Sequence, residues 1–167
     1  MESAHAFVEQ GSLSSSAPED VFRHFLADSL RLVGEESPLA YATLTRTLEG
    51  RTVAVAVGDE MVVIHGDASG PRLGSRARPI PEVEVSASHA AILSIVDGRS
   101  RLLQAIRAGR IDLRGTAGSI ADFHDALQAY VHGAVRSRSH PALLRAFRAQ
   151  VETLSSEEPD RDRNTGR

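Results

Sequence analysis

The sequence predicts an α+β fold for a single domain with about five strands. Three observations support this prediction. Apolar residues recur at helical spacing over 21–33, alternate with a period of two over 52–86, and return to helical spacing over 88–154, where one short run at 110–115 alternates again. With 167 residues, 41% of them hydrophobic and 25% charged, the chain is long enough to bury a core of its own.

Both ends of the chain are expected to be disordered tails. Residues 1–16 end in a serine-rich run, and 155–167 (SSEEPDRDRNTGR) contain no aliphatic residue. Neither segment buries enough apolar surface to offset its ordering entropy. We therefore expect one domain over 17–154.

The first helix is expected to begin after Ser16 and to end at Gly34. Glu19 stands three residues after the serine, as in a capping box, and Pro18 suits the first turn. The apolar stripe of this helix consists of Val21, Phe22, Phe25, Leu26, Leu30 and Val33. Such a stripe needs a cover, which would be the rest of the domain or a second copy in a homodimer.

A second helix and a β-hairpin are expected next. Residues 38–50 are interpreted as helical, although 42–48 also alternate as a strand would. The runs Thr52–Val57 and Met61–Gly66 are rich in β-branched residues. They flank Gly58-Asp59, a dipeptide that can take positive φ and so suits a tight hairpin turn.

The middle of the chain predicts short elements. Residues 67–81 are interrupted by proline and glycine, which favours a loop or an irregular edge strand, and 82–86 alternate as a half-buried strand does. Between 86 and 109 we expect two short helices, the first capped by Ser86 or Ser88 and the second by Ser100, each ended by a glycine. The run RIDLRG at 110–115 predicts a further strand.

Two longer helices are expected to complete the domain. The first would begin at 118–119 with a cap formed by Ser119 and Asp122, and the last would begin near Pro141. Their apolar stripes are Ile120, Phe123, Leu127, Val131 and Ala134 in the first, and Leu143, Leu144, Phe147, Val151 and Leu154 in the second.

Composition excludes several kinds of chemistry. The chain has no cysteine and no lysine, which rules out disulfides, thiolate nucleophiles and lysine Schiff bases. It contains no His-x-x-x-His pair, no Walker loop and no Gly-x-Gly-x-x-Gly loop, so we expect no metal, no cofactor and no catalytic residue. A net charge of −3 gives no reason to expect nucleic acid, and no apolar run is long enough for integral membrane association. We expect a cytoplasmic protein, and the arginine-only basic residues suggest a bacterial source.

The segment from Glu82 to Leu127, EVEVSASHAAILSIVDGRSRLLQAIRAGRIDLRGTAGSIADFHDAL, resembles the sterol-carrier-protein type 2 lipid-binding domain. The residues that carry the resemblance are Ser88, Ile95, Gly98, Ala105, Gly109, Ile111, Leu113 and Gly115. The resemblance implies an antiparallel-dominated, twisted sheet of about five strands covered by helices. It also implies an apolar tunnel between sheet and helices that holds fatty acyl chains, sterols or other lipids, without catalysis. The helix expected over 17–34 is an addition to this pattern.

The resemblance and the helical spacing together nominate ligand-binding residues. The expected apolar lining consists of Ile92, Leu93, Val96, Leu102, Leu103, Ile106, Ile111, Leu113, Phe123, Leu127 and Tyr130. His124 is a candidate polar contact because positions 120, 123, 124, 127 and 131 form one helical face. Arg136 is a second candidate, for an anionic head group near a tunnel mouth.

Three kinds of function stay open on the sequence alone. The first is a non-catalytic carrier or sensor of a hydrophobic small molecule. The second is a protein interaction module with a filled core, in which the first helix mediates self-association. The third is a cyclase or isomerase of bacterial secondary metabolism that uses the cavity to fold a substrate and needs His124 or Tyr130 as its acid or base.

Overall fold

The structure, a computed structural model, describes residues 20–74, 80–96 and 99–157. The tail expected over 1–16 and the cap expected from Ser16 and Glu19 lie outside the described residues, as does 158–167. The prediction of a tail from 155 onward is wrong for 155–157, which belong to the last helix. The hydroxyl groups of Ser155 and Ser156 donate to backbone carbonyls one turn earlier, so these serines are satisfied within the helix.

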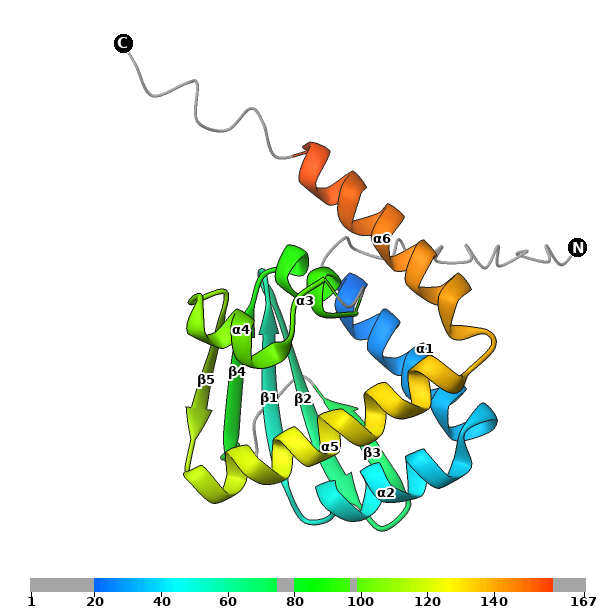
Figure 1. Ribbon diagram of the computed structural model, residues 1–167, viewed down its shortest axis with the longest axis vertical. Coiled ribbons are helices and arrows are strands. Elements are labelled where there is room, and N and C mark those ends of the chain that lie inside the picture. Colours follow the sequence, from blue (N-terminus) through cyan, green and yellow to red (C-terminus); the bar gives the residue numbers. More distant parts are fainter. Residues whose placement is uncertain (1–19, 75–79, 97–98, 158–167) are drawn as a thin grey trace, which may run out of the picture.

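The sheet has the strand order β3-β2-β1-β4-β5, as Figure 1 shows. Three of its pairings, β1 with β2, β2 with β3 and β4 with β5, are antiparallel, and β1 pairs with β4 in parallel. The expected antiparallel-dominated sheet is therefore confirmed, and residues 70–74 form the edge strand that was one of two alternatives there. The strands are β1 (Thr52–Val57), β2 (Glu60–Asp67), β3 (Gly70–Gly74), β4 (Val83–Ala87) and β5 (Ile111–Gly115).

Helices cover one face of this sheet, and α5 crosses in front of the strands in Figure 1. The helix expected over 38–50 is confirmed. The helices are α1 (Val21–Glu36), α2 (Pro38–Leu48), α3 (His89–Val96), α4 (Leu102–Arg107), α5 (Ala117–Arg136) and α6 (His140–Glu157).

Three expected helix ends are wrong. Helix α1 continues past Gly34 to Glu36. Helix α5 is capped by Thr116, whose Oγ1 accepts a hydrogen bond from the Ser119 backbone N at 3.2 Å, and not by Ser119 with Asp122. Helix α4 has Arg101, not Ser100, at its N-cap position. Several residues near the start of α5 can cap a helix, so composition alone does not select among them.

A buried carboxylate fixes the start of α1 against the sheet. The Glu60 side chain of β2, in a residue only 8% exposed, accepts hydrogen bonds from the backbone N of Phe22 at 2.9 Å and of Arg23 at 3.2 Å. The first N–H groups of a helix have no partner within the helix and carry partial positive charge, so a carboxylate there satisfies them and stabilises the helix end. This contact positions α1 as a wall beside the sheet.

The apolar stripe of α1 is covered within the chain. The rings of Phe25 and Phe147 stack with centroids 4.2 Å apart, which joins α1 to α6. On its other side α1 meets α5 at Gly133, where a Cβ atom would lie 2.5 Å from Cγ1 of Val33. The reason for expecting a homodimer, an uncovered α1 face, therefore no longer applies.

Candidate ligand-binding cavity

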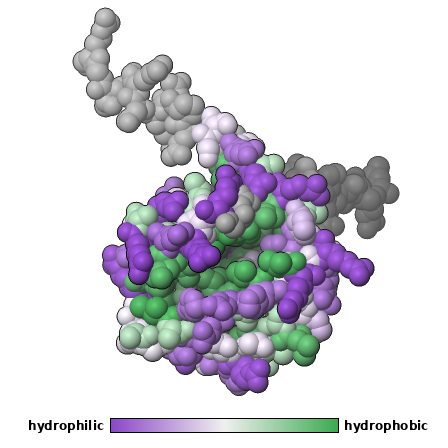
Figure 2. All heavy atoms as spheres, in the orientation of Figure 1, coloured by the Kyte–Doolittle hydropathy of each residue, from purple (hydrophilic) through white to green (hydrophobic). Residues whose placement is uncertain are grey.

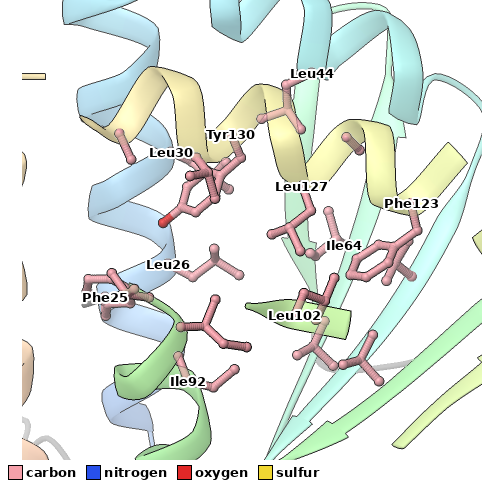
Figure 3. A pocket seen from close by; sticks show the side chains of 18 of the residues that line it. Phe25, Leu26, Leu30, Leu44, Ile64, Ile92, Leu102, Phe123, Leu127 and Tyr130 are labelled. Carbon is pink, nitrogen blue, oxygen red and sulfur yellow. The ribbon is translucent and has the colours of Figure 1, made fainter. Parts of the chain in front are cut away.

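A cavity of about 430 Å³ lies between the helix-covered face of the sheet and helices α1, α2, α3, α4 and α5, and it extends to the start of α6. Figure 2 shows it as a hollow with apolar walls on the face seen in Figure 1. Figure 3 shows lining side chains from α1, α2, α5 and the short helices pointing toward one another across it. The volume lies within the range of about 300–1,000 Å³ that is typical of small-molecule sites.

The periodicities of the sequence build these walls. Alternate residues of a strand point to one face of the sheet, so Val53 and Val55 of β1 and Ile111 and Leu113 of β5 all face the helices. Residues three or four apart on a helix share a face. This spacing brings Phe22, Phe25, Leu26 and Leu30 of α1, and Phe123, Ala126, Leu127, Tyr130 and Ala134 of α5, to the cavity.

Most of the predicted lining residues meet at the cavity. Those that line it are Ile92, Val96, Leu102, Ile111, Leu113, Phe123, Leu127 and Tyr130. Leu93 and Ile106 pack in the hydrophobic core but are not among the lining residues. Leu103 is 58% exposed, because it lies about 100° around the helix from Leu102 and so faces solvent.

The two predicted polar contacts lie outside the cavity. The His124 side chain is 52% exposed, and its Nε2 lies 3.1 Å from Nε2 of Gln128 on the same helix. The assignment of His124 to the apolar side is wrong, because the buried side of α5 is centred on the positions of Ala126 and Ala129 and 124 is turned away from it. Arg136 is exposed and does not line the cavity.

The first helix supplies a wall that the sequence analysis did not assign to the site. Its apolar stripe was identified, but only as a surface in need of a cover. Phe25, Leu26 and Leu30 lie beside the cavity in Figure 3. The strands of the hairpin were likewise expected but not connected with a ligand site.

A polar cluster of three side chains also escaped the sequence analysis. Oγ of Ser29 lies 2.6 Å from Oη of Tyr130 and 2.8 Å from Nε2 of His140, so it connects α1, α5 and α6. Ser29 is fully buried and His140 is 5% exposed. One signal for it was present: Ser29 occupies a position of the α1 stripe where every neighbour at helical spacing is apolar.

Burial keeps both titratable members of this cluster neutral near pH 7. Removal from water raises the pKa of Tyr130 to about 12, although the hydrogen bond to Ser29 opposes the change. Burial also lowers the pKa of His140 from its usual 6.5, and the nearby charge of Glu36 opposes this shift more weakly. The cluster therefore offers hydrogen bonds without charge.

Neither a metal-binding cluster nor a helix that could span a membrane is found in the described part of the chain. Over 20–74, 80–96 and 99–157, no group of three or more histidine, aspartate or glutamate residues is placed to hold a metal ion. None of the helices formed by these same residues is long and apolar enough to cross a membrane.

Fold and cavity together define an α+β domain that encloses an apolar space. Its fold is similar to that of sterol carrier protein domain 2 of Helicoverpa armigera, with a TM-score of 0.51 and 16% identity over 72% of this chain and 95% of that chain. The chain thus has a sterol-carrier-protein-2-like fold, which confirms the resemblance seen in the sequence.

Two further solved structures match with lower TM-scores. The UbiJ-SCP2 ubiquinone synthesis protein matches with a TM-score of 0.48 and 18% identity over 62% of this chain and 88% of that one. Sterol carrier protein 2 like 2 from Aedes aegypti matches with a TM-score of 0.43 and 18% identity over 62% and 93%. No family model matches the sequence, and no curated protein does.

Proposed function

We propose that this protein binds and carries a hydrophobic small molecule, a lipid with an acyl or alkyl chain or a sterol-like body, without catalysing a reaction on it. The observation that carries the proposal is the cavity of about 430 Å³ with almost entirely apolar walls. Burial of alkyl groups against such walls contributes roughly 0.8 kcal/mol per CH₂, so binding needs little specific chemistry. The similarity of fold to a sterol carrier protein domain supports the proposal.

The alternatives from the sequence analysis are less well supported. An interaction module with a filled core does not require open space between sheet and helices. A cyclase or isomerase needs an acid or base that reaches its substrate, and His124 faces solvent. Tyr130 does line the cavity, but a pKa of about 12 makes its hydroxyl a poor acid near pH 7.

Displacement of a fluorescent fatty acid, 11-(dansylamino)undecanoic acid, tests the proposal. Leu127→Trp adds a bulky ring system to the cavity wall, while Gln128→Trp makes the same kind of change at the next, exposed position of α5. We expect the first variant to bind the probe at least about tenfold more weakly than the natural protein, and the second to bind it within about twofold. The chain has no tryptophan of its own, so energy transfer from either new tryptophan gives an independent readout of binding.

Two results would count against carriage. One is the absence of probe binding by the natural protein together with the absence of co-purified lipid in native mass spectrometry. The other is an equal affinity in both tryptophan variants, which would place the bound probe outside the cavity.

A further inference from the structure

One end of the cavity, where α1, α5 and α6 meet, differs in chemistry from the rest. Among the described lining residues, Tyr130 and His140 alone carry polar side chains. Ser29 joins them from α1 through hydrogen bonds of 2.6 and 2.8 Å, and the Tyr130 ring reaches from α5 toward α1 in Figure 3. The remaining walls are formed by aliphatic and phenylalanine side chains.

The hydrogen-bond inventory of this cluster leaves one position open. If Tyr130 donates to Ser29 and Ser29 donates to Nε2 of His140, the Tyr130 oxygen keeps an acceptor site. If instead His140 donates to Ser29 and Ser29 donates to Tyr130, the Tyr130 hydroxyl keeps its proton for another acceptor. Within the described residues its hydroxyl bonds to Ser29 alone, so in either arrangement it has capacity for a further partner.

The surroundings favour a partner without charge. No arginine, aspartate or glutamate belongs to the described lining residues, so a carboxylate at this end would lose its hydration without a counter-charge. Burial also disfavours the charged forms of the cluster itself, as the raised pKa of Tyr130 and the lowered pKa of His140 indicate. A hydroxyl group can both donate and accept, and it suits either arrangement of the cluster.

We infer that the Tyr130 hydroxyl, positioned by Ser29 and His140, binds the neutral oxygen of an alcohol head group while the hydrocarbon part lies along the apolar walls toward Phe123 and Leu102. This head-group site rests on the proposed function, since it needs a ligand in the cavity. It assigns the ligand class as neutral lipids with a hydroxyl group. Ser29 and His140 act through Tyr130 as positioning residues.

A comparison of 1-decanol with 1-fluorodecane tests the site, because fluorine is close to a hydroxyl in size but does not donate and accepts only weakly. Both compounds are used to displace the dansylated fatty acid from the natural protein and from Tyr130→Phe. We expect the preference for the alcohol over the fluoride to fall about threefold to tenfold in the variant, the effect of one hydrogen bond. Taking the ratio of the two affinities cancels changes in packing that affect both ligands alike.

Two further variants complete the test. Tyr41→Phe makes the same chemical change at the chain's other tyrosine, which is partly buried but does not line the cavity, and should leave the ratio within about twofold of its natural value. Ser29→Ala removes the link to His140 and should lower the ratio as Tyr130→Phe does.

The outcomes separate the head-group site from the proposed function. A preference for the alcohol that is the same in Tyr130→Phe, Ser29→Ala and the natural protein overturns the head-group site, while binding of both compounds still supports carriage. Failure of both compounds to bind the natural protein overturns carriage and the site together. A loss of preference in Tyr41→Phe equal to that in Tyr130→Phe also overturns the site, because the effect would then not be local.

Discussion

The size of the cavity predicts how affinity depends on the chain length of a ligand. At roughly 30 Å³ for each water-sized group, a space of about 430 Å³ holds about fourteen such groups. Each CH₂ that moves from water to the apolar walls contributes about 0.8 kcal/mol, which is close to a fourfold gain in affinity. For a series of straight-chain alcohols we expect this gain per carbon up to about fourteen carbons, and little gain beyond, because further carbons stay at the mouth in contact with water.

This series is measured by competition against the dansylated fatty acid, with alcohols of about six to eighteen carbons. The alcohols are delivered from cyclodextrin, and each measured affinity is corrected for binding of the alcohol to cyclodextrin. Leu127→Trp occupies part of the cavity and should move the break to shorter chains, whereas Gln128→Trp should leave the break in place. A constant gain per carbon through the longest alcohol would refute the estimate of a cavity that holds only about fourteen carbons. Affinity that does not depend on chain length would refute burial in the cavity altogether.

Three further predictions concern the framework that shapes the cavity, each measured as the free energy of unfolding in urea. Glu60→Gln removes the charged acceptor at the start of α1 and should cost about 2 kcal/mol, while Glu84→Gln at an exposed position of β4 should change little. Gly133→Ala should destabilise by about 1–3 kcal/mol despite the better helix propensity of alanine, because its Cβ would lie 2.5 Å from a valine methyl group of α1. At Gly118 no described atom beyond its chain neighbours and its own helix backbone lies within 4 Å of an added Cβ, so Gly118→Ala should not destabilise; an equal loss in both glycine variants would contradict the steric argument. Because the pKa of folded His140 lies below its usual 6.5, the unfolded chain takes up this proton first, and stability should fall as the pH is lowered from 7 through 6.5 toward the folded-state pKa. His140→Gln should lessen that fall, and an unchanged pH dependence would show that His140 does not cause it.

Local patterns were sufficient to predict most elements of the fold. The alternation on either side of Gly58-Asp59 predicted the hairpin, and Gly58 does take a positive φ of 59°. Helical spacing predicted the apolar faces of α1 and α5, and these faces became walls of the cavity. Such patterns are readable because a helix or strand buries residues at a fixed spacing whatever its partner is.

Contacts between distant segments were not predictable in this way. Glu60 accepts a hydrogen bond from the backbone N of Phe22, 38 residues earlier, and Ser29 and His140 are 111 residues apart. A single sequence does not show which helix ends come together in the fold. The partners of Glu60, which follows a turn, and of His140, which precedes a proline, could therefore not be predicted. The error at His124 has another cause: helical spacing in the sequence did not show where the buried face of α5 is centred or how wide it is, and position 124 is turned away from that face.

The segment on which the resemblance was based does not contain the residues that form the polar end of the cavity. The segment over 82–127, on which the resemblance to sterol carrier proteins was based, supplies strands, short helices and much of the apolar wall. None of Ser29, Tyr130 and His140 lies within it, and Ser29 comes from α1, a helix outside that segment. The resemblance therefore gave no indication of this polar cluster, which lies where α1 and α6 meet α5. Substitutions in α1, α5 and α6 should accordingly change the preference for 1-decanol over 1-fluorodecane. Substitutions confined to β4 and β5 should change the affinities for both compounds alike.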